Sequence, residues 1–287
     1  MIGFPSRPPA PRTRSGPVQV VAHRGDSGAE PEHTLAAYRR AIEVGADALE
    51  CDVRLTADGH LVCVHDRRVD RTSNGTGLVS TLELTQLEGL DWGSWRSLPT
   101  ADSDDEEPDV VEPGDRSKLL TLRRLLTLVA DSGAGVELAI ETKHPTRYGG
   151  LVERRLVETL DRFGWANPAP GRTSPVRVMS FSLLALRRMR QLAPQLPLVF
   201  LADRMLPLLR EGTLPRGVGT AGLGVQVLRA HPELPDRLHE RGHAVHVWTV
   251  DEPEDVRRCL QAEVEAIITN RPQAVLEQLG RDTEAPR

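Results

Sequence analysis

The chain of 287 residues is 39% hydrophobic and carries a formal net charge of −5. No run of about 18 apolar residues occurs, which argues against a membrane-spanning helix. The length suits either two modest domains or one (β/α) barrel. The first 17 residues are rich in Pro, Arg and Ser and lack an apolar core segment. They predict a disordered arm over 1–17 and not a secretory signal.

Negative charge is concentrated in one segment. Ala101–Asp115 holds eight of the 41 carboxylates and no Lys or Arg, so the rest of the chain carries +3. A run of like charge predicts a solvated acidic loop. Together with the lack of an arginine-and-aromatic stripe, this run argues against nucleic acid as a partner.

Three cysteines, Cys51, Cys63 and Cys259, occur without the C-x-x-C spacing of metal sites. An odd number of cysteines does not fit a disulfide framework. We therefore expect the three cysteines to be small core residues, and the protein to be in a reducing, cytoplasmic environment.

Short β-rich runs alternate with longer helical patterns along the chain. The predicted strands are Val18–His23, Ala48–Arg54, His60–His65, Val136–Glu141, Val176–Phe181, Leu198–Leu201, Gly222–Val227, His243–Val250 and Ala266–Thr269. The predicted helices are Thr34–Val44, Leu119–Ala130, Leu151–Phe163, Leu183–Leu192, Pro232–Arg241, Pro253–Gln261 and Pro272–Leu279. The last three open with Pro, which suits a first helical turn.

This regular alternation predicts an α/β fold with a mostly parallel sheet. Nine strands are one more than an eight-stranded TIM barrel needs. The strand His60–His65 follows the turn signal Thr56–Gly59, so we interpret it as an extra hairpin strand paired with the second strand. A long insertion over 66–118 follows it, and connections of that length are usually lids or disordered segments. We expect one barrel over 18–280 and a tail over 281–287.

Polar residues stand where several buried strands end. His23 and Arg24 end the first strand, and Glu50 and Asp52 lie near the end of the second. Glu141, Lys143 and Trp248 lie at the ends of two later strands. Residues i and i+2 of a strand share a face, and the carboxyl ends of barrel strands form the face where active sites lie. These side chains are therefore expected to meet.

The residue types in this group indicate phosphodiester hydrolysis. The carboxylates of Glu50, Asp52 and Glu141 are hard oxygen ligands, which predicts bound Mg²⁺ or Ca²⁺. His23 and His65 can exchange protons near neutral pH. Arg24 and Lys143 are cations suited to a phosphate. Each of these residues alone has an ordinary structural explanation, such as a surface histidine or an ion pair. Such explanations would have to hold independently at four strand ends, which is improbable.

The motifs carrying these residues resemble the glycerophosphodiester phosphodiesterases over about Val18 to Leu279. The matching stretches are His23-Arg24-Gly25, Pro31-Glu32-His33-Thr34, Glu50-Cys51-Asp52-Val53, Thr56-Ala57-Asp58-Gly59, Val64-His65-Asp66, Glu141-Thr142-Lys143 and Trp248-Thr249-Val250. The resemblance implies a TIM barrel, a divalent metal on Glu50, Asp52 and Glu141, and acid/base catalysis by His23 and His65. It also implies phosphate binding by Arg24 and Lys143, a supporting role for Glu32 and a substrate wall at Trp248.

Three positions differ from the usual pattern of this family. His33 stands where the family most often has Asn, Asp251 where Asn is common, and Asn270 where Asp is common. None of the three is a predicted ligand or acid/base group, so the differences concern substrate choice and the tuning of the site.

The expected reaction is metal-assisted hydrolysis of a small-molecule glycerophosphodiester to sn-glycerol 3-phosphate and an alcohol. The alternative within this class is a lysophospholipase D acting on single-chain lipids, with Trp92 and Trp95 as candidates for an aromatic groove. An alternative of another class is a non-catalytic barrel that binds phosphate or metal. The order of the two histidines as acid and base, the preferred cation and the oligomeric state stay open.

Overall fold

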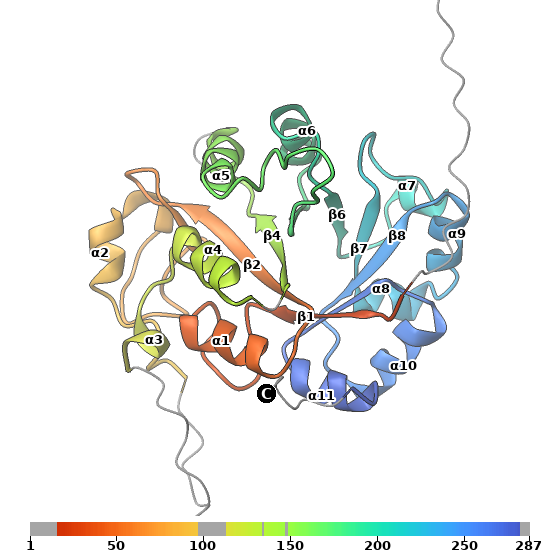
Figure 1. The fold of residues 1–287 in the computed structure, drawn as a ribbon, viewed down its shortest axis with the longest axis horizontal. Coiled ribbons are helices and arrows are strands. Elements are labelled where there is room, and N and C mark those ends of the chain that lie inside the picture. The colour runs from red at the N-terminus through yellow and green to blue at the C-terminus, as the bar shows by residue number, and fades with distance from the viewer. Residues whose placement is uncertain (1–15, 97–112, 134, 147–148, 282–287) are drawn as a thin grey trace, which may run out of the picture.

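Eight parallel strands close into a ring in the computed structural model, which describes residues 16–96, 113–133, 135–146 and 149–281 (Figure 1). The order around the sheet is β1-β9-β8-β7-β6-β5-β4-β2, and pairing of β1 with β2 closes it. The ring strands are β1 (Gln19–His23), β2 (Ala48–Leu55), β4 (Glu137–Thr142), β5 (Val176–Ser180), β6 (Leu198–Ala202), β7 (Thr220–Gly224), β8 (Ala244–Trp248) and β9 (Ala266–Thr269). The predicted TIM barrel is confirmed.

The extra strand β3 (Leu61–Cys63) lies outside the ring, antiparallel to β2, with Val53 opposite Cys63. The turn before it needs Gly59, whose φ of +84° is in the left-handed region that glycine adopts without steric cost. The Thr56 hydroxyl accepts a hydrogen bond from the backbone N–H of His60 across this turn. The predicted hairpin is therefore present, with a shorter return strand than expected.

Helices surround the ring (Figure 1). Thr34, Thr121 and Ser182 cap the helices α1, α4 and α6 by accepting a hydrogen bond from an N–H of the first turn. The helices are α1 (Leu35–Glu43), α2 (Leu84–Glu88), α3 (Pro113–Ser117), α4 (Leu122–Asp131), α5 (Leu151–Asp161), α6 (Leu183–Leu192), α7 (Pro207–Arg210), α8 (Val225–Ala230), α9 (Leu234–Glu240), α10 (Pro253–Gln261) and α11 (Pro272–Gln278), with a short 3₁₀ turn η1 (Val79–Thr81).

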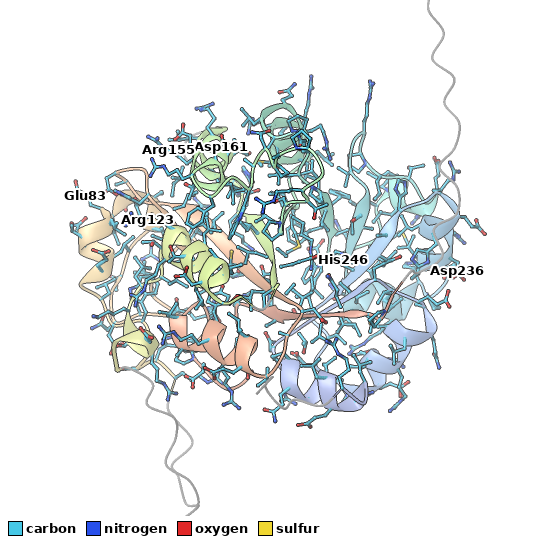
Figure 2. All side chains as sticks on the ribbon, viewed as in Figure 1. Glu83, Arg123, Arg155, Asp161, Asp236 and His246 are labelled. Carbon is cyan, nitrogen blue, oxygen red and sulfur yellow. The ribbon has the colours of Figure 1, made fainter. Side chains whose placement is uncertain are left out.

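Two layers of core hold the barrel together. Small and β-branched side chains such as Val21, Ala48, Ala139 and Ala266 fill its interior. Larger clusters pack the helices onto the outside of the strands, and Figure 2 shows the side chains between them. Because inward and outward positions alternate along each strand, the interior positions continue upward into the polar residues at the carboxyl ends.

Some predicted element bounds are wrong. The strand expected over Gly222–Val227 ends at Gly224, and α8 begins at Val225. Val225 and Val227 favour a strand, but the chain leaves the sheet where β7 reaches the carboxyl end of the barrel and continues as α8. The helix predicted from Pro232 begins at Leu234. The short helices α2, α3, α7 and α8 and the turn η1 were not expected.

The insertion over 66–118 is partly described, and η1, α2 and α3 lie in it. Val69, Val79, Leu87 and Trp92 pack there against strand β3 in a small apolar cluster. Most of the predicted arm, of the acidic loop and of the tail lies outside the described residues.

Candidate active site

The strand-end residues predicted from the sequence meet at one end of the barrel. A cavity of about 170 Å³ opens there at the carboxyl ends of the strands. Asp52 and Glu32 flank it through contacts with Arg24. The cavity is lined by His23, Arg24, Glu50, His65, Glu141, Lys143, Met179, Phe181, Leu201, Trp248, Thr249 and Ile268.

Backbone geometry at His23-Arg24-Gly25 brings the first of these side chains to the cavity. Gly25 has a φ of +82°, and a Cβ at this position would lie 2.6 Å from the backbone carbon of Ala37 in α1. Only glycine therefore fits this close approach. Arg24 itself has a φ of +60°, and its backbone N–H donates to the Glu50 carboxylate at 3.1 Å. The close turn ties the end of β1 to β2.

Three buried carboxylates form the floor of the site. Glu50, Asp52 and Glu141 each have an oxygen within 4.8 Å of the others. Burial, and then the negative charge of Asp52, raises the pKa of Glu50 well above its ordinary value and that of Glu141 to about 8. Like charges this close in a low-dielectric setting repel one another unless a cation is present. The donor set of three hard oxygens therefore fits a divalent cation.

Cations of the chain lie against the same carboxylates. Lys143 Nζ lies 2.8 Å from Glu141 and 3.2 Å from Asp52, and Arg24 Nε lies 3.2 Å from Asp52. Burial alone would raise the pKa of Asp52, but Lys143, the hydrogen bond from His33 and Arg24 hold it well below its ordinary value. The site thus joins negative charge for a metal with positive charge for a phosphate.

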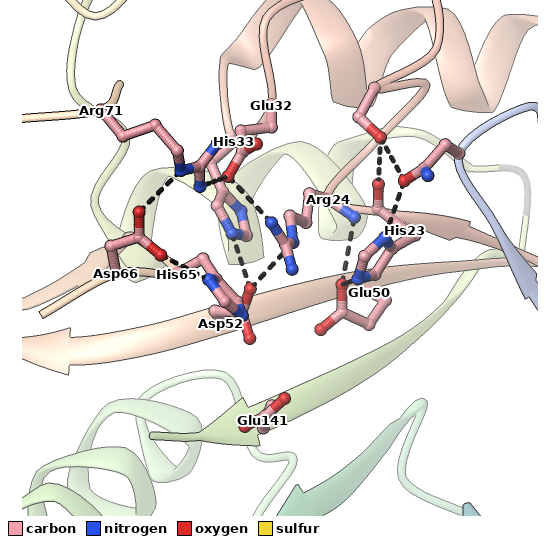
Figure 3. A network of polar contacts seen from close by, with 12 residues as sticks. His23, Arg24, Glu32, His33, Glu50, Asp52, His65, Asp66, Arg71 and Glu141 are labelled. Atoms are coloured by element: carbon pink, nitrogen blue, oxygen red, sulfur yellow. Dashed lines mark hydrogen bonds and ion pairs between the residues drawn. The ribbon is translucent and has the colours of Figure 1, made fainter. Parts of the chain in front are cut away.

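Each of the two predicted acid/base histidines has a hydrogen-bond partner at its Nδ1 atom. His23 Nδ1 lies 2.7 Å from Asn270 Oδ1, and His65 Nδ1 lies 2.7 Å from Asp66 Oδ1 (Figure 3). Burial and the charge of Arg24 lower the pKa of His23 to about 4. Burial also lowers the pKa of His65, against the attraction of Asp52. Both rings are therefore neutral near pH 7 and can accept a proton.

A chain of ion pairs outside the carboxylates supports Arg24 and His65 (Figure 3). Glu32 binds Arg24 at 3.0 Å and Arg71 at 2.7 Å, and Arg71 Nε donates to Asp66 at 2.6 Å. Burial opposes ionisation of Glu32, but the hydrogen bonds from Arg71 and the charge of Arg24 lower its pKa to about 2. Glu32 therefore joins Arg24 to Arg71, and its supporting role stays a prediction.

Several residues of the site were not assigned a role from the sequence. Arg71 lies in the insertion, where no periodic pattern pointed to it. Asp66 directly follows His65, which was a usable signal. His33 donates from Nε2 to Asp52 at 3.0 Å, and its Nδ1 lies 2.8 Å from the Tyr38 hydroxyl. The sequence marks His33 only as a departure from the family pattern and assigns it no role.

Apolar side chains form one wall of the cavity. Trp248 stands edge-on to Phe181, with ring centroids 5.5 Å apart, and its Nε1 donates to the Gly222 carbonyl at 3.0 Å. Trp92 and Trp95, the candidates for an aromatic groove, do not line this cavity. The Trp92 side chain is buried against the Leu87 carbonyl, which accepts from its Nε1. Phe181 and Trp248 therefore supply the aromatic surface of this cavity, and an aromatic groove at Trp92 and Trp95 stays a prediction.

Within the described residues, no helix is both long and apolar enough to cross a membrane.

Comparison with known proteins relates the chain to one family. Residues 23–274 match the Glycerophosphoryl diester phosphodiesterase family. A probable glycerophosphodiester phosphodiesterase 1 of Mycobacterium tuberculosis is 49% identical over 253 residues, which cover 88% of this chain and 89% of that protein. A glycerophosphodiester phosphodiesterase of Caldanaerobacter subterraneus subsp. tengcongensis is 31% identical, covering 90% and 96%.

Solved structures agree on the architecture. An Oleispira antarctica phosphodiesterase in complex with the product sn-glycerol-3-phosphate matches with a TM-score of 0.75 and 23% identity. The match covers 91% of this chain and 96% of that one. At this identity the likeness shows the shared barrel fold.

Proposed function

The chain belongs to the Glycerophosphoryl diester phosphodiesterase family and is a phosphoric diester hydrolase, and from this premise we propose that it hydrolyses glycerophosphodiesters to sn-glycerol 3-phosphate and an alcohol. One observation carries the proposal. Three buried carboxylates, two neutral histidines and two cations surround one small cavity. This is the set that metal-assisted cleavage of a phosphodiester needs.

The roles of the chain's own residues follow from their positions. Arg24 and Lys143 bind the phosphate oxygens and stabilise the charge that develops on them. One histidine of the pair His23 and His65 takes a proton from the attacking water or glycerol hydroxyl. The other, which enters the step as the imidazolium, gives its extra proton to the alcohol oxygen as the phosphorus–oxygen bond breaks. Either histidine can fill either role.

Glu50, Asp52 and Glu141 would hold a divalent cation, Mg²⁺ or Ca²⁺. Their crowding supports this part of the proposal, because burial and then the charge of Asp52 raise the pKa values of Glu50 and Glu141, and a bound cation would stabilise the ionised carboxylates. When bound, the cation would supply charge stabilisation at the phosphate and a low pKa for a bound water.

A reducing, cytoplasmic location is part of the same proposal. Cys51, Cys63 and Cys259 are free and buried, as expected of structural cysteines in a reducing environment.

A lysophospholipase D activity is the second candidate, and the apolar wall favours it. Phe181 lines the cavity and is 40% exposed, and Leu183 and Leu184 at the start of α6 are 49% and 61% exposed. These exposed apolar side chains are the feature that an acyl chain could use.

Side-by-side hydrolysis tests separate the candidates. The purified protein is offered glycerophosphocholine and lysophosphatidylcholine with Mg²⁺ or Ca²⁺, and the phosphate-containing product is identified. We expect release of sn-glycerol 3-phosphate from glycerophosphocholine at the higher kcat/KM. Preference for the lysolipid would favour the second candidate. Stoichiometric metal binding without turnover of either substrate would contradict both.

A further inference from the structure

Two residues behind His23 form a hydrogen-bonded relay that does not reach the cavity. Asp251 follows β8, and Asn270 directly follows β9. The two strands are parallel neighbours, with Val247 opposite Ile267, so their carboxyl ends meet at the same edge. The relay runs from Asp251 through Asn270 to the ring of His23.

Asp251 fixes the orientation of the Asn270 amide. The Asp251 carboxylate accepts from the Asn270 backbone N–H at 2.8 Å and from the Thr269 hydroxyl at 3.0 Å. Asn270 Nδ2 donates to the second oxygen of Asp251 at 2.6 Å. A carboxylate only accepts hydrogen bonds, so the NH₂ end of the amide faces Asp251. Asn270 Oδ1 must then point the other way.

The direction of the amide determines which nitrogen of His23 carries the proton. Asn270 Oδ1 lies 2.7 Å from His23 Nδ1, and the hydroxyl of Ser27 approaches the same oxygen at 2.8 Å. An amide oxygen has no proton to give, so Nδ1 of the ring must be the donor. In a neutral imidazole the other nitrogen, Nε2, is then an acceptor.

Nε2 is the atom of His23 nearer the carboxylate floor. It lies 3.9 Å from Glu50 Oε2, and His23 lines the cavity. Figure 3 shows the His23 ring beside Glu50. An unprotonated Nε2 at this place can take a proton from a reacting hydroxyl, whereas the other tautomer presents an N–H there.

We propose that Asp251 and Asn270 are positioning residues that hold His23 in the Nδ1-protonated tautomer with an unprotonated Nε2 toward the substrate. The proposal rests on the proposed hydrolysis for its kinetic consequence.

Single and double exchange variants of the full chain test the relay. Asp251→Asn places an NH₂ group against the Asn270 amide, so Asn270 turns over and offers its NH₂ to His23. Asn270→Asp places two carboxylates in contact. The double variant Asp251→Asn with Asn270→Asp restores one donor and one acceptor. Asp236→Asn is the matched control, because Asp236 is exposed on α9, away from the cavity (Figure 2).

For hydrolysis of glycerophosphocholine we expect each single variant to lower kcat by about 10–100-fold, the usual effect of a residue that orients a reacting group. KM should not change, because neither residue touches the substrate. The double variant should recover most of kcat, and the control should match the wild type. Equal losses in the singles and the double, or losses in KM instead of kcat, would overturn the proposal.

The tautomer itself is measured on the ¹⁵N-histidine-labelled, metal-free protein by two-bond proton–nitrogen NMR spectra, with His23→Ala used to assign the signal. We expect Nδ1–H in the wild type and in the double variant, and Nε2–H in Asp251→Asn. An Nε2–H tautomer in the wild type would overturn the proposal. This readout is independent of turnover, so a protein that failed to hydrolyse any glycerophosphodiester would still report whether the relay acts.

Discussion

The two ends of the barrel both bury charge, in opposite ways. At the amino ends of the strands, Arg177 on β5 binds Glu137 at 2.7 Å and Gln19 at 3.0 Å, and Gln19 donates to Glu137. The Arg177 guanidinium there meets the opposite charge of Glu137, whose side chain is 45% exposed. At the carboxyl ends, Glu50, Asp52 and Glu141 crowd together around a cavity.

The difference shows that buried charge alone does not indicate a functional site. Nε and Nη2 of Arg177 are buried without a hydrogen-bond partner, but Arg177 and Glu137 carry opposite charges and need no further charged partner. Like charges held together despite repulsion do need one, and structures retain them where a ligand or reaction uses them. The end of the barrel at the amino ends of the strands, called the lower end below, is therefore expected to contribute stability. The end at the carboxyl ends, called the upper end, is expected to lower the stability of the fold in order to hold the reacting groups.

The largest expected effect is on the histidines of the upper end. His23→Ala and His65→Ala should each lower kcat by at least about 100-fold, the usual scale for a general acid or base. Steady-state hydrolysis of glycerophosphocholine measures this. His60→Ala is the matched control, since its side chain is 54% exposed and pairs with Asp58. Near-normal turnover in either site variant would remove that histidine from the reaction.

Glu141→Gln should separate stability from activity. The folded-state pKa of about 8, raised by burial and Asp52, lies above the ordinary 4.5. Its stabilising contribution is therefore complete below the ordinary pKa and is lost as the pH rises through the folded value. Glutamine carries no such charge, so the metal-free variant should unfold at a higher Tm than the wild type, and the gap should widen from about pH 5 to about pH 8 and stay constant above it. Hydrolysis should be lost.

Thermal melts in the presence of a chelator give these Tm values. A Glu141→Gln protein that melts below the wild type at high pH would contradict the view that the carboxylates of the upper end repel one another.

The smallest effect is expected at the lower end. Arg177→Met removes the hydrogen bonds to Glu137 and Gln19, but the half-exposed Glu137 regains water. The free energy of unfolding should fall by only on the order of 1 kcal/mol, as urea unfolding would show. Because the variant is far from the cavity, kcat should not change. A fall in kcat as large as that of the histidine variants would make the two ends functionally alike.

Local patterns in the sequence were sufficient for most of the fold. Leu183–Leu192, Pro253–Gln261 and Ala266–Thr269 match their predicted bounds because caps, prolines and apolar runs mark them. The sequence does not predict the end of β7 at Gly224. Val225 and Val227 favour a longer strand, but the height of the barrel determines where the strand ends.

Most of the predicted site residues could be found because they stand at strand ends, where the fold itself brings the side chains together. Glu32 lies in the loop between β1 and α1 and was indicated only by the family resemblance. The relay through Asn270 and the ion pair of Arg71 with Glu32 could not be found in this way. These contacts depend on the direction of single hydrogen bonds between segments far apart in the sequence, which residue type and spacing do not determine.

The central claim is that the crowded carboxylates of the upper end exist to hold a divalent cation for hydrolysis. Its most direct test is the hydrolysis of glycerophosphocholine by the full chain before and after treatment with EDTA, followed by titration with Mg²⁺ or Ca²⁺. We predict that EDTA abolishes release of sn-glycerol 3-phosphate and that one of these cations restores it. Full activity in the presence of the chelator would contradict the account.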